Sequence, residues 1–187
     1  MKRLFIIHGW GGNPDEKLLR WLGDECKQEG FEVVIPRMPN TDEPVIEEWI
    51  GHIKDIVGAP DEETFFIGHS IGCQAIMRYL ETINEKIGGA VFMGGWFTLT
   101  GIDDLEDQEI VKPWEEENID FGKIKEVTSN IVVVLSDDDP YVPYKDNKER
   151  FEKYLNAKII TEHNKGHFTN DDGVEDLSSV KKALLDF

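Results

Sequence analysis

The chain has 187 residues and a formal net charge of −18, because 38 acidic residues oppose 20 lysines and arginines. A chain of this length fits one domain with a substantial hydrophobic core. The acidity excludes a general nucleic-acid-binding protein, since no basic surface is available to displace phosphate counterions. It also disfavours strongly anionic substrates and anionic membrane surfaces.

Cysteine use and the N-terminal segment both bear on the cellular compartment. Cys26 and Cys73 are too few for a disulfide framework and belong to no CxxC pair, so we expect reduced thiols. The apolar run at residues 4–7 is too short for the core of a signal peptide, and no other segment approaches a membrane span. We therefore predict a soluble, cytoplasmic protein.

Short apolar runs alternate with amphipathic stretches along the chain. Strand–helix alternation with nearly continuous apolar strands predicts an open, mostly parallel sheet with helices on both faces. The expected fold class is α/β, with one domain over residues 1–187. The predicted strands are residues 4–7, 31–35, 64–67, 90–93, 131–135 and 158–161, and the predicted helices are residues 15–29, 43–57, 73–84, 145–155 and 174–187.

Residues 97–123 interrupt this alternation between two predicted strands. The stretch carries nine acidic residues and is too long for a simple connection. It is therefore either a functional, lid-like insertion or a solvated excursion.

The motif Gly68-His69-Ser70-Ile71-Gly72 lies between a predicted strand and a predicted helix. A serine nucleophile at a tight strand-to-helix turn needs small neighbours, because two backbone segments approach closely around it. The alternative interpretation is a glycine-rich turn with a helix-capping serine. We interpret Ser70 as a nucleophile.

A serine nucleophile needs a base that is itself oriented by an acid. Candidates follow two later strands at their carboxyl ends, where reactive groups collect in open α/β sheets. The strand at residues 131–135 is followed by Ser136-Asp137-Asp138-Asp139-Pro140, and the strand at 158–161 is followed by His163 and His167. The order Ser, Asp, His along the chain is the one expected for an α/β-hydrolase.

The acid and the base that would assist Ser70 each have competing candidates. Asp139 is preferred to Asp138 as the acid, since Asp139-Pro140-Tyr141-Val142-Pro143 resembles the D-x-x-V-P string that follows the acid in many α/β-hydrolases. His167 is preferred to His163 as the base, because Gly166 gives its loop the freedom to reach back to the serine. The alternative for either histidine is a surface position in a polar loop.

An oxyanion hole requires two N–H donors. One is expected from the backbone of Ile71 after the nucleophile, and the second from the loop His8-Gly9-Trp10-Gly11-Gly12, with Trp10 as the candidate. The same loop taken alone would suit a phosphate, but no GK[ST] follows it and no G-x-G-x-x-G is present.

Three aromatic residues, Trp96, Phe97 and Trp114, border or lie within the insertion. They are candidates to line an acyl pocket, and packing within the insertion is an equal alternative. The acidic run at residues 137–139 together with His8 would suit Mg²⁺ or Mn²⁺, but no HExxH motif or spaced Cys/His set is present, so we predict no metal. Cys73 is more consistent with a small core residue than with a reactive thiol.

With Gly68-His69-Ser70-Ile71-Gly72, Asp139 and His167 in place, the sequence resembles the α/β-hydrolase superfamily. More narrowly, it is similar to the small serine-hydrolase family that includes retinoblastoma-binding protein and bacterial relatives of similar size. The resemblance implies a triad of Ser70, Asp139 and His167 and serine-hydrolase activity. Two features depart from that family: the His8-Gly9-Trp10 string is typical of general esterases and lipases, and the acidic insertion is longer than a minimal member needs.

We therefore predict a serine hydrolase that cleaves small carboxylic esters through an acyl-enzyme on Ser70, without cofactor or metal. The expected partner is a small ester or acyl substrate, with no nucleic acid or membrane, and the expected state is a monomer or small homo-oligomer. Two alternatives stay open: a thioesterase, amidase or acyltransferase of the same fold, and a non-catalytic module whose acidic insertion engages a basic partner.

Overall fold

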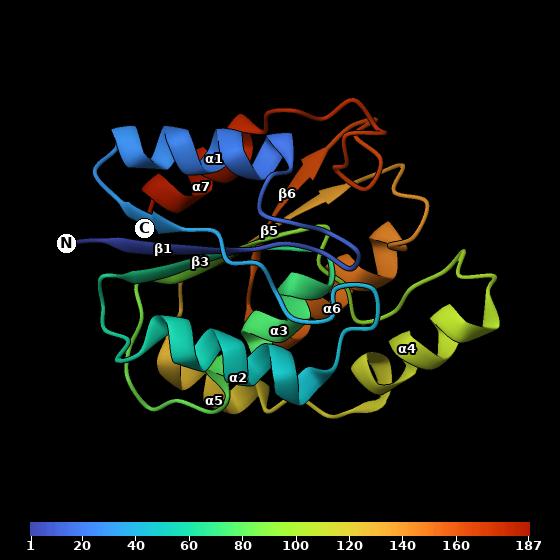
Figure 1. Cartoon of the computed structure of the whole chain (residues 1–187), viewed down its shortest axis with the longest axis horizontal. Coiled ribbons are helices and arrows are strands. Elements are labelled where there is room, and N and C mark those ends of the chain that lie inside the picture. Colours follow the sequence, from blue (N-terminus) through green and yellow to red (C-terminus); the bar gives the residue numbers. More distant parts are fainter.

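Six strands form one parallel sheet in the computed structural model, which describes residues 1–187 (Figure 1). The spatial order of the strands is β2-β1-β3-β4-β5-β6, and each neighbouring pair is parallel. The predicted α/β class with an open parallel sheet is confirmed. The strands are β1 (Arg3–Ile7), β2 (Glu32–Val34), β3 (Thr64–His69), β4 (Gly89–Met93), β5 (Ile131–Ser136) and β6 (Lys158–Glu162).

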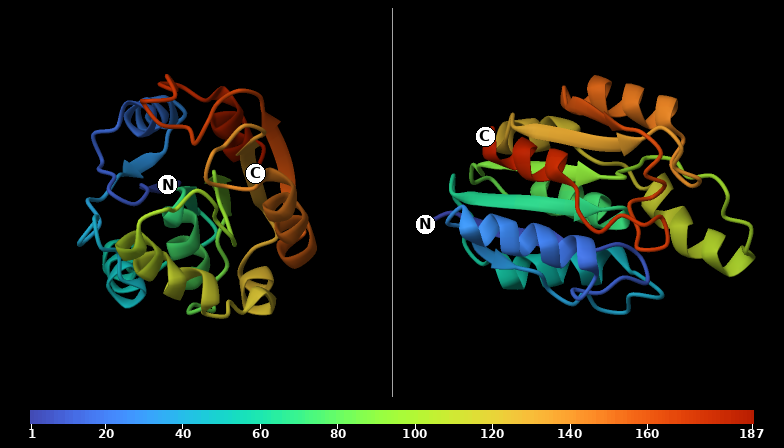
Figure 2. Two further views of the ribbon diagram at one scale, coloured as in Figure 1. Left: turned by 90° about the vertical axis from the view of Figure 1, so that its right-hand side faces the viewer. Right: turned by 90° about the horizontal axis from the view of Figure 1, so that it is seen from above.

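Helices cover both faces of this sheet, as Figures 1 and 2 show. One face carries α1 (Lys17–Gln28) and α7 (Ser178–Leu185). The opposite face carries α2 (Ile46–Val57), α3 (Ile71–Leu80), α5 (Phe121–Val127) and α6 (Tyr144–Leu155). Each strand and helix predicted from the sequence occurs, with ends that differ from the predicted ones by at most four residues.

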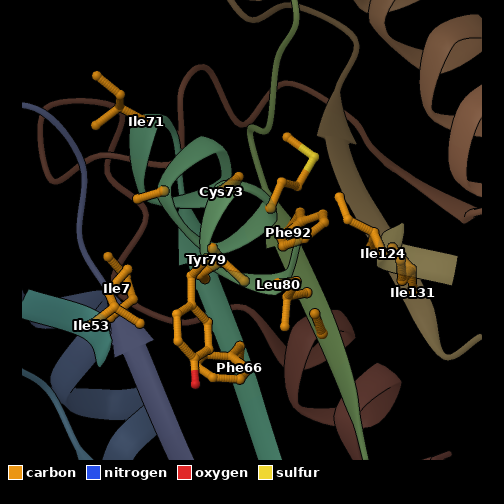
Figure 3. Packing of buried hydrophobic residues seen from close by; sticks show 14 of the residues in the cluster. Ile7, Ile53, Phe66, Ile71, Cys73, Tyr79, Leu80, Phe92, Ile124 and Ile131 are labelled. Atoms are coloured by element: carbon orange, nitrogen blue, oxygen red, sulfur yellow. The ribbon is translucent and has the colours of Figure 1, made fainter. Parts of the chain in front are cut away.

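Two hydrophobic clusters lie on the two faces of the sheet. Successive side chains of a strand point to opposite faces, so Leu4 and Ile6 enter the cluster below α1 and α7 while Phe5 and Ile7 enter the larger cluster on the other face. Figure 3 shows part of the larger cluster, with Phe66 among its members. Burial on both faces explains why these strands are continuous apolar runs in the sequence.

The insertion contains a helix that the sequence analysis did not predict. Helix α4 (Leu105–Glu116) and the start of α5 lie within residues 97–123, and α5 is likewise absent from the predicted helices. The carboxylate of Asp104 accepts a hydrogen bond of 2.8 Å from the N–H of Glu106 and caps α4. Only Val111 and Trp114 of this helix are buried, and Pro113 lies inside it, so its apolar periodicity is weak. Helix α4 projects past the carboxyl ends of the strands (Figure 2).

The order in which strands are added to the sheet reverses at β1. Strand β2 lies on one side of β1 and β3 on the other, so the segments that follow β1 and β3 lead to helices on opposite faces. In open α/β sheets, ligands bind at the carboxyl ends of the strands at such a switch point. This topology brings the glycine-rich loop after β1 next to the turn that contains Ser70. None of the helices combines the length and the hydrophobicity that a membrane-spanning helix needs.

Candidate active site

Ser70 occupies a strained turn between β3 and α3. Its φ of 53° and ψ of −123° lie in a region that L residues rarely adopt. A Cβ atom on Gly72 would lie 2.4 Å from the backbone oxygen of Ile7, and one on Gly68 would lie 2.9 Å from the backbone of Cys73. The two glycines are therefore required by the close approach of backbone around the serine. The Ser70 side chain makes no capping hydrogen bond to α3, so the alternative of a helix-capping serine is wrong.

His167 lies between Ser70 and Asp139. Its Nε2 is 2.8 Å from Ser70 Oγ, and its Nδ1 is 2.7 Å from Asp139 Oδ2. The Asp139 side chain is only 1% exposed, and its Oδ1 accepts hydrogen bonds from the N–H groups of Tyr141 and Val142. The carboxylate is therefore held by main-chain donors on one side and faces the imidazole on the other. These distances are within the range for proton transfer between positioned side chains.

The other two aspartates of the run face different partners. Asp138 Oδ1 accepts hydrogen bonds from Ser136 Oγ at 2.6 Å and from the N–H of Gly166 at 2.9 Å. Asp137 lies 2.5 Å from His163 Nδ1, and this pair lowers the pKa of Asp137 and raises the pKa of His163. Asp138 makes no hydrogen bond to His167, and His163 makes none to Ser70, so only Asp139 and His167 of the competing candidates are linked to the serine.

The end of β5 and the residues after it hold the loop after β6 through several hydrogen bonds to its backbone. Asp137 accepts from the N–H of Asn164, Ser136 Oγ from the N–H of Lys165, and Asp138 from the N–H of Gly166. Asp139 then meets the side chain of the next residue, His167. The acidic run therefore sets the position of the whole loop that carries the histidine.

The loop after β1 lies against the serine and is fixed by a buried histidine. His8 is fully buried, its Nε2 accepts a hydrogen bond from the N–H of Met38, and its Nδ1 lies 2.9 Å from the oxygen of Gly9. Burial lowers the pKa of His8. A Cβ on Gly9 would lie 3.3 Å from the Cβ of Ser70, so the loop passes directly beside the nucleophile candidate.

The two residues predicted to supply N–H donors both lie near Ser70. Ile71 is the first residue of α3, so its N–H has no acceptor within the helix. Trp10 lines the same cavities as Ser70, and its indole Nε1 donates to the backbone oxygen of Asp42.

Two cavities meet at Ser70 and His167. The smaller, of about 280 Å³, lies between the β1 loop and the segment after His167, and Trp10 is the one hydrophobic side chain in its lining. The larger, of about 470 Å³, extends toward the insertion and is lined in part by Leu99, Ile102 and Tyr141. Ser70 and His167 are therefore part of the wall of both cavities.

The chain also matches a known family over nearly its whole length. A sequence model of the family described as serine hydrolase matches residues 4–186. The chain belongs to the serine hydrolase family. The predicted resemblance is thereby confirmed, and the fold described above is the α/β-hydrolase fold of its structural neighbours.

Individual relatives of this serine hydrolase agree with the assignment. The chain is 29% identical to the serine hydrolase RBBP9 of Rattus norvegicus, over 95% of this chain and 87% of the relative. The crystal structure of the ydeN gene product from Bacillus subtilis superposes with a TM-score of 0.89 at 26% identity, over 100% of this chain and 98% of that one. Est1E from Butyrivibrio proteoclasticus superposes with a TM-score of 0.76 at 17% identity, over 99% of this chain and 87% of that one, which shows a shared fold alone.

The predicted aromatic pocket of this serine hydrolase requires correction. Trp96, Phe97 and Trp114 do not line either cavity at Ser70, because all three are buried in the larger hydrophobic cluster. Trp114 packs edge-on against Trp49, with ring centroids 6.0 Å apart. The apolar wall of the larger cavity is instead formed by Leu99, Ile102 and Tyr141. The sequence analysis missed these residues, because single apolar side chains in or beside polar segments form no recognisable pattern.

The remaining candidate groups make no separate site. His8 and the aspartates of residues 137–139 engage the two loops described above, and no group of three or more His, Cys, Asp or Glu side chains is arranged to hold a metal ion. Cys73 is fully buried, and burial raises the pKa of its thiol well above the usual value. A buried thiol of this kind is inert, in agreement with a core cysteine.

Proposed function

We propose that the protein is a carboxylic-ester hydrolase in which Ser70 is the nucleophile, His167 the general base and Asp139 the residue that orients His167. The observation that carries this proposal is the unbroken chain of contacts from Asp139 Oδ2 through both ring nitrogens of His167 to Ser70 Oγ. Membership of the serine hydrolase family supports the same chemistry.

In the first half of the proposed reaction, Ser70 Oγ attacks the ester carbonyl carbon while His167 Nε2 accepts the hydroxyl proton. The carbonyl oxygen becomes an oxyanion, for which the N–H groups of Trp10 and Ile71 are the proposed donors. Each such donor is worth about 10²- to 10³-fold in rate. Collapse of the tetrahedral intermediate breaks the C–O bond to the alcohol, which leaves with the proton from His167.

In the second half, water attacks the acyl-enzyme while His167 Nε2 accepts a water proton. The ester bond to Ser70 breaks, Oγ recovers the proton from His167, and the carboxylic acid leaves. The scheme balances with one ester and one water consumed and needs no further reactant.

Cavity size and the position of the insertion support small substrates. Cavities of about 280 and 470 Å³ lie on the two sides of Ser70, one for each side of a scissile ester bond. Ile102 and Asp107 of the insertion contribute to the wall of the larger cavity. We therefore assign residues 97–123 the role of a lid-like wall over the substrate.

The proposal is tested by fluorophosphonate labelling of wild type, Ser70→Ala and His167→Ala, followed by intact-mass analysis. We expect one adduct on wild type, none on Ser70→Ala and labelling slowed by at least about 10³-fold on His167→Ala. Undiminished labelling of Ser70→Ala would place the reactive group elsewhere. No adduct on folded wild type would overturn the proposal and favour the non-catalytic interaction module.

The leaving group is tested with an ester, a thioester and an amide that share one small acyl chain. We expect hydrolysis of the ester, abolished in Ser70→Ala. Cleavage of the thioester or amide alone would contradict the ester assignment and leave the same residues with a different leaving group.

A further inference from the structure

Each hydrogen-bonding atom of His167 has its own partner. Nε2 meets Ser70 and Nδ1 meets Asp139, as described above. The main-chain N–H donates to Asp172 Oδ2 at 3.0 Å, and the main-chain oxygen lies 2.8 Å from His69 Nε2. Two side chains therefore hold the backbone of His167, independently of the two that meet its ring.

The backbone around His167 has a conformation that is intrinsically unfavourable. His167 lies between two residues with positive φ, Gly166 at 52° and Phe168 at 59°. A positive φ is unfavourable for a phenylalanine, so the surrounding structure must stabilise it. Loss of an anchor on the His167 backbone would release this strain and displace the imidazole.

We propose that His69 is a positioning residue that holds the main-chain oxygen of His167, and thereby keeps its Nε2 in line with Ser70 for proton transfer. The proposal rests on the proposed function of His167 as the base. His69 is the last residue of β3 and precedes Ser70 directly, so the anchor and the nucleophile share one rigid strand end. The link fixes the base relative to the nucleophile across 98 residues of sequence.

Burial suits His69 to this role. Its side chain is in the protein interior, and the ring lies beside that of His167 with centroids 5.2 Å apart. Because a carbonyl oxygen only accepts, Nε2 of His69 must carry the proton. Burial lowers the pKa of His69 to about 4, so the ring is neutral near pH 7 and places no positive charge beside His167.

The test compares His69→Phe, which keeps a ring but has no donor, with His69→Gln, which keeps an N–H donor. His52→Gln on α2 is the matched control. We expect His69→Phe to lower kcat by about 10- to 100-fold, since a displacement of about 1 Å costs on that order, while KM stays within about twofold. We expect His69→Gln to recover most of kcat. Unchanged kcat in His69→Phe, or equal defects in both variants at unchanged Tm, would overturn the proposal.

Two measurements by NMR do not depend on hydrolysis. The Nδ1–H proton of His167 gives a downfield resonance when it is bonded to Asp139, and we expect this resonance in wild type and His69→Gln but not in His69→Phe. Persistence of this resonance in His69→Phe would overturn the proposal.

The second measurement is the ¹⁵N chemical shifts of His69 in wild type, which we expect to report the Nε2–H tautomer. The opposite tautomer would overturn the proposal even if His69→Phe fails to fold. Absence of wild-type labelling by fluorophosphonate would instead count against the proposed function alone.

Discussion

Asp138 and Asp139 carry the same carboxylate one residue apart but face different partners. Asp139 meets the imidazole of His167, whereas Asp138 holds the backbone of the loop through Gly166. A carboxylate on Nδ1 fixes the tautomer of the base and stabilises the imidazolium that forms. A carboxylate on a backbone N–H only fixes geometry, so the two residues should differ in their effect on rate.

We predict that Asp139→Asn lowers kcat by about 10³- to 10⁴-fold, because an amide can favour the wrong tautomer of His167. Asp138→Asn is the matched variant, with an expected loss of about tenfold, because the contacts of the His167 ring remain. Steady-state ester hydrolysis and a thermal melt of each variant supply the measurement. Equal losses in the two variants would remove the distinction between the aspartates.

Helix α4 is held firmly at one end. Arg78 of α3 is 2% exposed, and its guanidinium donates hydrogen bonds to the backbone oxygens of Trp114 at 2.9 Å and Glu117 at 3.1 Å. At the other end, Leu105 is 75% exposed. The end of α4 nearer the cavity is thus less constrained than the end bound by Arg78.

Replacement of Arg78 should therefore weaken the attachment of α4. We predict that Arg78→Met lowers the free energy of unfolding by about 1–3 kcal/mol, because the buried backbone oxygen of Trp114 is left without a donor. Urea denaturation provides the measurement. The control is Arg150→Met, which alters an exposed arginine of α6 and should stay within about 0.5 kcal/mol of wild type. A similar stability for both variants would show that the two backbone bonds contribute nothing to the attachment.

Excess negative charge is a property of the whole molecule. A net charge of −18 on a chain of this size produces self-repulsion in the folded state. Most ion pairs of the protein involve exposed side chains, such as Lys17 with Glu175, and pairs of this kind contribute little to stability. Long-range repulsion should therefore outweigh the local attraction.

We predict that Tm rises as NaCl is increased from about 0.01 M to about 0.15 M, because the added ions shorten the screening length from about 30 to about 8 Å. Differential scanning calorimetry at constant pH measures the change. A fall in Tm over this range would mean that the surface ion pairs dominate the repulsion.

Local patterns in the sequence were enough to predict the fold and to select the candidate residues that the structure brings together at Ser70. Apolar runs buried on both faces predict parallel strands, and the two glycines around Ser70 predict the tight turn that close backbone contact requires. The prediction that Asp139 and His167 approach Ser70 depends on the rule that carboxyl ends of parallel strands share one edge, together with the D-x-x-V-P string at Asp139 and the glycine before His167. Helix α4 was missed, because an acidic stretch with Pro113 and few apolar positions lacks the periodicity that identifies a helix.

Contacts between distant segments decided what the local patterns left open. The local D-x-x-V-P string favours Asp139 over its neighbours, but the different contacts of Asp137 and Asp138 follow from the packing of residues 136–139 against residues 163–167. The burial of Trp96 and Trp114 depends on how the insertion packs on α2 and α3, and the role inferred for His69 depends on a contact across 98 residues. The strands, the tight turn at Ser70 and the types of the candidate site residues therefore follow from the sequence alone, since these depend on neighbours along the chain. Whether a side chain lines the cavity, lies in the hydrophobic core or binds the backbone of the loop that carries His167 was decided by the tertiary structure. Each of these contacts depends on the packing of segments far apart in sequence.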